Sequence, residues 1–208
     1  RISCCRPWMT QGSTKIRLAK GPSQLRIIGG AWRGRRLPVL SQDGLRPTPD
    51  RVRETLFNWL QSLVAGSRCL DLFAGSGALG LEALSRGAAQ TTLVDSNRSA
   101  CKQILLNLQQ LDTDNADVLC SDAMSWLDHY RGPGFDIIFL DPPFHGELAE
   151  PVMQRLQSRA AIRPGARVYV EQSIHEATLT IPPDWQILRD KTAGQVRYRL
   201  LGVPSAQL

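Results

Sequence analysis

The sequence lacks any apolar run near the roughly 18 residues of a membrane-spanning helix, and residues 1–24 contain no apolar stretch of the signal-peptide type. Its five cysteines form no CxxC pair. An odd number of cysteines without a secretion signal is typical of reduced thiols, so we expect a cytoplasmic protein. The three histidines are scattered and have no metal-ligand spacing, so we expect no metal.

Acidic residues are absent from residues 1–42, which contain nine Lys or Arg. Residues 1–24 are basic and poor in apolar residues, which predicts a flexible tail. Because the chain does not begin with Met, we expect residues 1–8 to be a vector or upstream remnant and Met9 to be the natural start.

The densest basic segment is "RIIGGAWRGRR", at residues 26–36. Its arginines alternate with Gly, Ile and Trp, a mixture that can follow a phosphate backbone and stack on a base. We therefore predict that this segment binds nucleic acid through Arg26, Trp32, Arg33, Arg35 and Arg36.

The order of elements predicts the fold class. Glycines in residues 25–40 predict a short hairpin or extended arm, and a helix with Asp50 as its N-cap should follow. From Arg68, apolar strands ending in "DLFAG", "VD", "SD" and "LD" alternate with helical segments, a further strand "ARVYVEQS" follows, and a hairpin closes the chain. This order predicts an α/β fold, a Rossmann-like, doubly wound, mostly parallel seven-stranded sheet with an antiparallel edge strand. We divide the chain into the tail (1–24), the arm and helix (25–64) and the sheet domain (65–208).

The first strand ends in a glycine motif, "DLFAGSGALG". It contains Gly75-x-Gly77-x-x-Gly80 between a strand and a helix, and Asp95 follows 20 residues after Gly75. This pattern matches a dinucleotide fingerprint, so by itself it fits a nicotinamide-dependent dehydrogenase. Tight turns also need glycine without any ligand, because glycine tolerates positive φ.

Asp71 argues against a dinucleotide, since its carboxylate would face a pyrophosphate unfavourably. It suits S-adenosylmethionine, whose methionine part is cationic. We predict that Asp71 faces the methionine moiety, that Asp95 accepts both ribose hydroxyls, and that Asp122 reads the adenine together with the backbone of Ala123 and Met124. The same predicted cofactor site includes Phe73, Ala74, Gly75, Ser76, Gly77 and Ser96.

The fourth strand ends in "FDIIFLDPPFHG". An exocyclic amine on a nucleobase is a poor nucleophile because its lone pair is delocalised into the ring. Acceptors aimed at its hydrogens can expose that lone pair, and the Asp141 carboxylate and the Pro142 carbonyl are candidates. Pro142 and Pro143 make the corner rigid and donate no N–H. Phe144 can stack on an extruded base, and we assign no role to His145.

These motifs resemble the class I S-adenosylmethionine-dependent methyltransferases that modify exocyclic amino groups. With "RIIGGAWRGRRL", "GLRPTPDRVRETLFNWL", "GSGALGLEALSRGA" and "AGQVRYRL", the chain resembles the bacterial 16S ribosomal RNA guanine-N2 methyltransferase family from about Leu25 to Leu201. The resemblance implies one Rossmann-like domain, a basic N-terminal hairpin and a single guanine of 16S rRNA as target. It also implies that Arg46 and Thr48 border the cofactor pocket. In one departure, "VDSNR" supplies no second acid, so Asp95 must bind the ribose without one.

Other functions stay open at this point. A DNA adenine-N6 or cytosine-N4 methyltransferase would share the chemistry, but it needs a sizeable recognition region and the gaps between the motifs are short. A dehydrogenase leaves the corner at residues 141–144 unexplained, and a non-catalytic RNA-binding or ribosome-assembly module leaves Asp141 without a role. Carbon-5 pyrimidine methylation usually needs a thiol after a proline, and no cysteine follows proline. From its size we expect a monomer that acts on RNA presented within a 30S particle or assembly intermediate.

Overall fold

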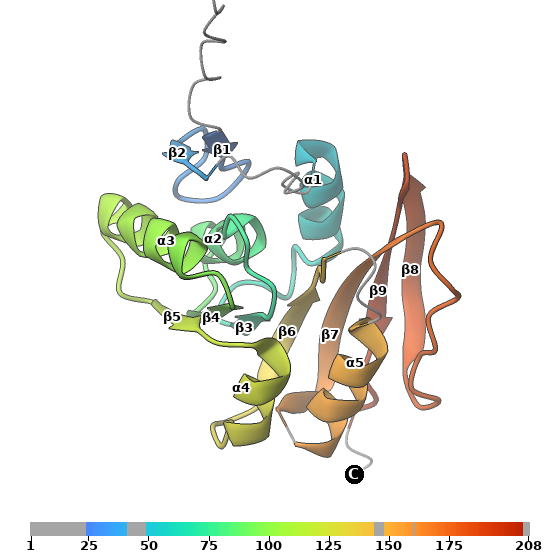
Figure 1. The fold of residues 1–208 in the computed structure, drawn as a ribbon. Coiled ribbons are helices and arrows are strands. Elements are labelled where there is room, and N and C mark those ends of the chain that lie inside the picture. The colour runs from blue at the N-terminus through green and yellow to red at the C-terminus, as the bar shows by residue number, and fades with distance from the viewer. Residues whose placement is uncertain (1–23, 41–48, 144–147, 160, 206–208) are drawn as a thin grey trace, which may run out of the picture.

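A central sheet organises the chain in a computed structural model, which describes residues 24–40, 49–143, 148–159 and 161–205 (Figure 1). The strands of this sheet are β3 (Arg68–Asp71), β4 (Gln90–Asp95), β5 (Ala116–Cys120), β6 (Phe135–Leu140), β7 (Ile162–Ser173), β8 (Gln186–Ala193) and β9 (Val196–Gly202). The predicted residues Arg46, Thr48 and Phe144, with His145 and nearly all of the tail, lie outside the described residues.

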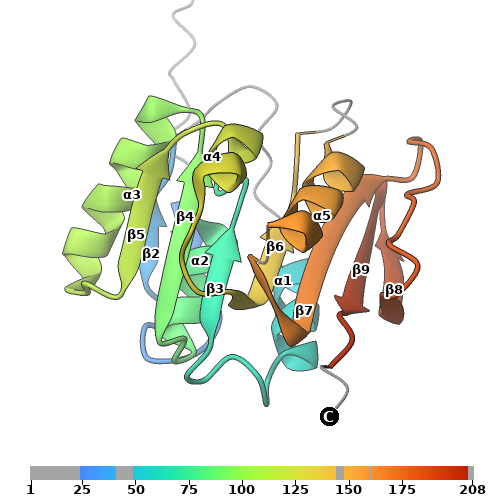
Figure 2. The same cartoon turned by 90° about the horizontal axis from the view of Figure 1, so that it is seen from below.

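The strand order is β5-β4-β3-β6-β7-β9-β8, seen from below in Figure 2. The pairs from β5 to β7 are all parallel, and β9 is antiparallel to both β7 and β8. The fold class is therefore confirmed. The antiparallel strand β9 is not the outermost strand. The closing hairpin consists of β8 and β9, and it is β9 that pairs with β7, so β8 forms the edge of the sheet.

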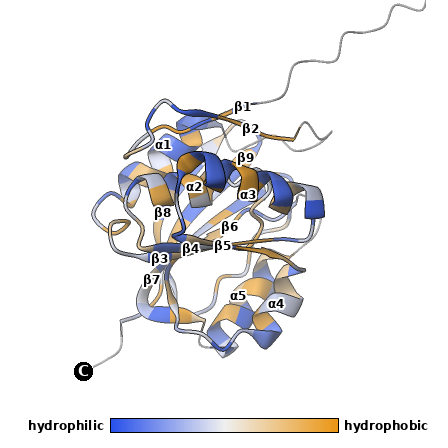
Figure 3. Cartoon of the chain, turned by 90° about the vertical axis from the view of Figure 1, so that its left-hand side faces the viewer, coloured by the Kyte–Doolittle hydropathy of each residue, from blue (hydrophilic) through white to orange (hydrophobic). Residues whose placement is uncertain are grey.

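Helices cover both faces of the sheet. Figure 3 shows α1 (Asp50–Trp59), α2 (Ala78–Ser85) and α3 (Arg98–Leu111) on one side, and α4 (Ala123–His129) and α5 (Ala149–Ser158) on the other. The apolar run of β6 is explained by this double cover. Ile138 and Leu140 pack on the side of α4 and α5, whereas Ile137 and Phe139 pack on the side of α1.

The strand order reverses between β3 and β6. From β3 the chain proceeds through α2 to β4 on one side, and β6 pairs with β3 on the other side. Open α/β sheets bind ligands at such a switch point, outside the carboxyl ends of the strands. The glycine motif and the Asp-Pro-Pro corner follow β3 and β6 and therefore meet at this place.

The basic segment forms the predicted hairpin, β1 (Gln24–Arg26) with β2 (Arg36–Pro38). Its inner side is apolar. Leu25, Ile27, Leu37 and Val39 are buried in one cluster with residues of α2 and α3. The hairpin is therefore packed on the sheet domain through a shared core.

A buried carboxylate on α2 also holds the hairpin. Glu82 is fully buried, and it accepts hydrogen bonds of 2.8 Å from the backbone N–H groups of Ile28 and Gly29. The Arg86 guanidinium donates to the same carboxylate at 2.8 Å, and the buried Arg53 guanidinium lies 3.8 Å away. A buried charge needs such partners, and here the partners include the hairpin backbone.

The predicted cap of α1 is wrong in detail. Pro49 occupies the N-cap position and Asp50 is the first helical residue. The Asp50 carboxylate pairs instead with Arg26 at 3.0 Å and with Arg53 at 2.6 Å, so it ties α1 to β1. At α3, where the sequence offers Ser96 or Asn97 as the cap, the Asn97 side chain is the one that accepts from the N–H groups of Ser99 and Ala100.

None of the helices in the described part of the chain has the length and apolar character that a membrane crossing requires.

We predict that Glu82→Ala destabilises the protein by about 3 kcal/mol or more, because it leaves two hairpin N–H groups and a buried guanidinium without their carboxylate. Urea unfolding followed by circular dichroism measures this loss. Glu54→Ala, at an exposed position on α1, is the matched control and should leave the midpoint unchanged. Equal midpoints for the two variants would contradict the role of Glu82.

Candidate functional site

The glycine loop between β3 and α2 has the geometry that only glycine adopts easily. Gly75 has φ of 52° and Gly77 has φ of 77°. At Gly80 the constraint is packing, because a Cβ atom there would lie 2.6 Å from Leu93 Cδ2 on β4. The loop therefore turns sharply, and α2 packs directly against β4.

Asp71 ends β3 with its side chain buried and its Oδ2 accepting from the Gly80 N–H at 3.1 Å. Burial raises the pKa of the Asp71 carboxyl to about 7, and the charges of Asp141 and Asp95 add to this rise. The site thus combines three carboxylates from three neighbouring strand ends. Such a site favours a cationic ligand, which would relieve the repulsion.

Asp95 ends β4 and is half-buried. Its Oδ2 accepts from the Gly75 N–H at 2.7 Å, and its Oδ1 accepts from the Asn97 N–H at 2.7 Å. These bonds fix the carboxylate at the rim of the glycine loop, and each oxygen keeps a further lone pair for a ligand hydroxyl. The ribose role of Asp95 stays a prediction, and exposed Ser96 follows it.

Asp122 has a structural task that the sequence analysis did not assign. It is the N-cap of α4, with its Oδ1 accepting from the Ser125 N–H at 2.8 Å. Ala123 is buried and Met124 packs half-buried against the sheet core. Their backbone therefore follows β5 in a fixed position, as an adenine-binding segment requires.

The Asp-Pro-Pro corner follows β6 directly. Asp71 pairs in register with Phe139, so Asp141 lies two residues beyond the level of Asp71 on the neighbouring strand. Asp141 and Pro142 are half-buried and Pro143 is exposed. The corner is thus open on the ligand side of the sheet and anchored by the buried β6.

Beside this corner lies a buried pair that was not predicted from the sequence. The Tyr169 hydroxyl donates to Glu171 Oε1 at 2.7 Å, and both residues lie on β7 with exposed fractions of 0% and 3%. Phe139 pairs with Tyr169 across β6 and β7, which places Asp141 beside Glu171 on the same face. Burial and the nearby Glu171 and Asp141 charges raise the pKa of Tyr169. The signal was available, because Glu171 is an acid at the end of an apolar strand, like Asp71.

The exposed loop of the hairpin lies apart from these carboxylates. The Ala31 N–H donates to the Ser85 carbonyl, and the Trp32 N–H donates to Ser85 Oγ at 3.0 Å. Ser85 ends α2, about 12 Å along the helix from the glycine loop, since each residue rises about 1.5 Å. The structure therefore brings Asp71, Asp95 and Asp141 together but does not bring the loop to them.

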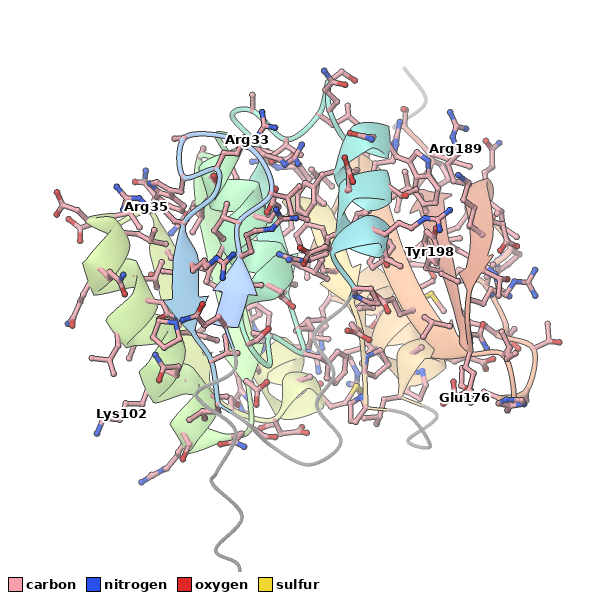
Figure 4. All side chains as sticks on the ribbon, turned by 90° about the horizontal axis from the view of Figure 1, so that it is seen from above. Arg33, Arg35, Lys102, Glu176, Arg189 and Tyr198 are labelled. Carbon is pink, nitrogen blue, oxygen red and sulfur yellow. The ribbon has the colours of Figure 1, made fainter. Side chains whose placement is uncertain are left out.

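The side chains of the hairpin that were predicted to bind RNA differ in their exposure and in their contacts with the protein. Arg33, Arg35 and Arg36 are exposed, and Figure 4 shows the first two on the side of α2 and α3. Arg26 is exposed but paired with Asp50. Trp32 is half-buried and packs against the hairpin core, so much of its ring is already in contact with protein.

The residues at the switch point fit S-adenosylmethionine better than a dinucleotide. The donor set is three carboxylates around a glycine loop, one of them buried with a raised pKa, and such a set would repel a pyrophosphate. Within the described residues, no group of three or more His, Cys, Asp or Glu side chains is arranged to hold a metal ion.

Known proteins share both this sequence and this fold. The chain is 50% identical over 180 residues to "Ribosomal RNA small subunit methyltransferase D" of Escherichia coli (strain K12), covering 86% of this chain and 90% of that protein. The solved structure of yhhF from Escherichia coli, provisionally named a methyltransferase, has a TM-score of 0.82 and 47% identity and covers 89% of this chain and 100% of that one.

A more distant structure shows the same fold. SMU.776, also provisionally named a methyltransferase and crystallised with SAH, has a TM-score of 0.65 at 18% identity, covering 81% of this chain and 53% of that one. The family model described as "Conserved hypothetical protein 95" matches residues 25–202. With a half-identical relative over most of its length, the chain belongs to this family, that of ribosomal RNA small subunit methyltransferase D.

Proposed function

We propose that the protein transfers a methyl group from S-adenosylmethionine to the exocyclic N2 amino group of a guanine in 16S rRNA. The observation that carries this proposal is the Asp141–Pro142 corner beside buried Asp71, at the switch point of a sheet. The relative with 50% identity, named for methylation of small-subunit ribosomal RNA, supports the RNA substrate. The Asp-Pro-Pro-Phe motif supports an exocyclic amino group as acceptor, and the family resemblance supports a single guanine.

The cofactor site would use side chains of three strand ends. When bound, S-adenosylmethionine supplies a methyl group on a positively charged sulfur. Asp71 would face the cationic methionine part, and Asp95, held by the Gly75 and Asn97 N–H groups, would accept the ribose hydroxyls. The segment of Asp122, Ala123 and Met124 would contact the adenine. Arg46 and Thr48 complete the proposed pocket.

The corner would prepare the acceptor amine. The Asp141 carboxylate and the Pro142 carbonyl would accept the two amine hydrogens, which shifts the nitrogen toward sp³ geometry and exposes its lone pair. Pro142 and Pro143 have fixed φ, so the acceptors hold their positions and positioning contributes to the rate. Asp141 is also the nearest carboxylate for the proton that the nitrogen must lose, and Phe144 would stack on the base.

The chain is small for an enzyme that finds one nucleotide in a long RNA. We infer that the RNA is presented by a 30S particle or an assembly intermediate, that a monomer acts on it, and that this takes place in the cytoplasm. The exposed hairpin arginines Arg33, Arg35 and Arg36 would contact phosphates away from the target base.

Asp141→Ala should reduce methyl transfer by about 100-fold or more, because the amine loses its charged acceptor. The affinity for S-adenosylmethionine should change little. Tritiated methyl transfer to 30S subunits lacking the modification, followed by nucleoside analysis, measures the rate and identifies the product. Asp114→Ala, at an exposed loop position, is the control. Wild-type turnover by the Asp141 variant would refute the mechanism.

The raised pKa of Asp71 predicts a pH-dependent affinity for S-adenosylmethionine. The neutral carboxyl predominates below a pKa of about 7, whereas a cationic ligand favours the carboxylate, so the affinity should increase from pH 6 to pH 8. Calorimetry in buffers of different ionisation enthalpy should detect proton release near pH 6.5.

Asp71→Asn is the matched variant for this measurement, and it should bind more weakly and lose this rise. The amino group of S-adenosylmethionine titrates in the same way with both proteins. The difference between their pH profiles of affinity therefore reports the Asp71 carboxyl alone. An identical pH profile in both proteins would exclude Asp71 as the titrating group.

The same pKa shift also affects folding. An acid whose folded pKa is raised destabilises the folded state as pH rises from its unfolded pKa near 4 to about 7. Asp71→Asn should therefore increase the unfolding midpoint of the ligand-free protein at pH 8 more than at pH 4.

Replacing Arg33, Arg35 and Arg36 with Ala should weaken RNA binding and make its dependence on log salt shallower by about 2, since each contact to single-stranded RNA contributes about 0.7. The catalytic rate at saturating RNA should stay constant. Arg159→Ala is the control, because Arg159 pairs with Asp128 on the α4 and α5 side of the sheet. An unchanged slope would remove the hairpin arginines from the RNA interface.

A further inference from the structure

The β8–β9 hairpin presents two different faces. On the face that packs against α1, Tyr198 and Leu200 of β9 are buried, and the Trp59 ring stacks on Tyr198 with centroids 5.5 Å apart. Lys191 of β8 is paired in register with Tyr198, and Arg189 with Leu200. Directly opposed residues share a face, so Lys191 and Arg189 extend the α1 face to the edge of the sheet.

The cations of this hairpin are divided between the two faces. On the face away from α1, Arg197 and Arg199 both contact the Asp190 carboxylate, at 2.6 and 3.4 Å. On the α1 face, Arg189 and Lys191 are exposed, and neither forms an ion pair with any residue that the structure describes. Lys191 Nζ lies 5.8 Å from the centroid of the Trp59 ring, which holds the ammonium over the aromatic surface.

The register connects this edge to the catalytic corner. Lys191 pairs with Tyr198, Tyr198 pairs with Glu171, and Glu171 lies beside Asp141. The four residues therefore form one row across β8, β9, β7 and the end of β6, on the α1 face. Three strand spacings separate the ends of the row, which is about 15 Å. Lys191 is thus within a few nucleotides of a base held at Asp141.

These cations also share a side of the molecule with the basic hairpin. Figure 4 shows Arg33 and Arg35 on one side of α1, and Arg189 and Tyr198 on the other. A nucleic acid that enters the corner from this side would pass between two positively charged edges. Lys191 is in line with the corner, whereas Arg189, two residues earlier on β8, lies toward the end of the strands where Figure 4 shows Arg33.

We propose that Arg189 and Lys191, supported by Trp59 and Tyr198, form a second RNA-contact surface that binds phosphates close to the target nucleotide. The proposal rests on the proposed function, since it assumes that RNA enters at Asp141. Two exposed cations that form no ion pair within the described residues, on a partly aromatic surface, match a polyanion, and the row that contains Lys191 leads to the corner. Arg197, in the same hairpin, is neutralised and faces the other way.

The test is the double variant Arg189→Ala with Lys191→Ala, compared with Arg197→Ala. Methyl transfer to 30S subunits lacking the modification should show a KM for the subunit increased about tenfold and an unchanged kcat. Binding of a protein-free fragment of the same RNA should have a log–log salt slope shallower by about 1.4. The affinity for S-adenosylmethionine should equal that of the wild type, and Arg197→Ala should behave as the wild type in the RNA assays.

These measurements distinguish a failure of the proposed function from a failure of the second RNA-contact surface. If the wild-type protein transfers no methyl group to RNA, the proposed function fails. If it does, but the double variant keeps the wild-type KM and slope, the second surface is wrong. A higher KM on subunits with an unchanged slope on protein-free RNA would assign the surface to a ribosomal protein and overturn the RNA proposal. Should the double variant unfold, Arg189→Gln, which leaves the Lys191–Trp59 contact intact, answers the same question.

Discussion

Two strands that are far apart in the sequence, β3 and β6, lie hydrogen-bonded side by side at the centre of the sheet. Their pairing places the turn after Asp71 next to the turn after Leu140, and every part of the site depends on it. Because both strands are covered on both faces, they cannot shift without exposing apolar surface. The rigidity of the site therefore comes from the burial of two apolar strands, which hold Asp71 at the end of β3 and Asp141 just after β6.

Acidic and basic side chains lie on different parts of the molecule. Acidic side chains gather at the carboxyl ends of β3, β4 and β6, where burial, and then the charges of Asp141 and Asp95, raise the pKa of Asp71. Exposed arginines and Lys191 lie away from them, on the hairpin and on β8. A polyanion is attracted to the periphery and repelled from the cofactor pocket, whereas a cationic small molecule has the opposite preference. The charge distribution thereby directs a polyanion and a cationic small molecule to different parts of the surface, on either side of the corner at Asp141.

The site residues could be predicted from the sequence where each of them follows a recognisable parallel strand. Asp71, Asp95 and Asp141 could be grouped because parallel strands deliver their carboxyl ends to the same side. Contacts between distant segments were not readable in the same way. Glu82 lies in a helix without any motif, and only the packed hairpin reveals its partners. Asp50 was predicted as a helix cap but is an ion-pair partner of Arg26. Trp32 was predicted to bind RNA, and its ring packs against the hairpin core. The position of β9 depended on which strand of the last hairpin reached β7.

Whereas the strands of the hairpin are attached through buried apolar side chains, its loop is held through the main chain. Glu82 binds the N–H groups of Ile28 and Gly29, and Ser85 receives those of Ala31 and Trp32 while its hydroxyl donates to the Gly29 carbonyl. Main-chain groups are present whatever side chains the loop carries. The attachment thus leaves the outward-facing positions free to vary, and an altered set of side chains at positions 33, 35 and 36 would be carried in the same place. Under the RNA contacts proposed above, this loop is a surface whose side chains can be exchanged in protein engineering without altering the corner at Asp141.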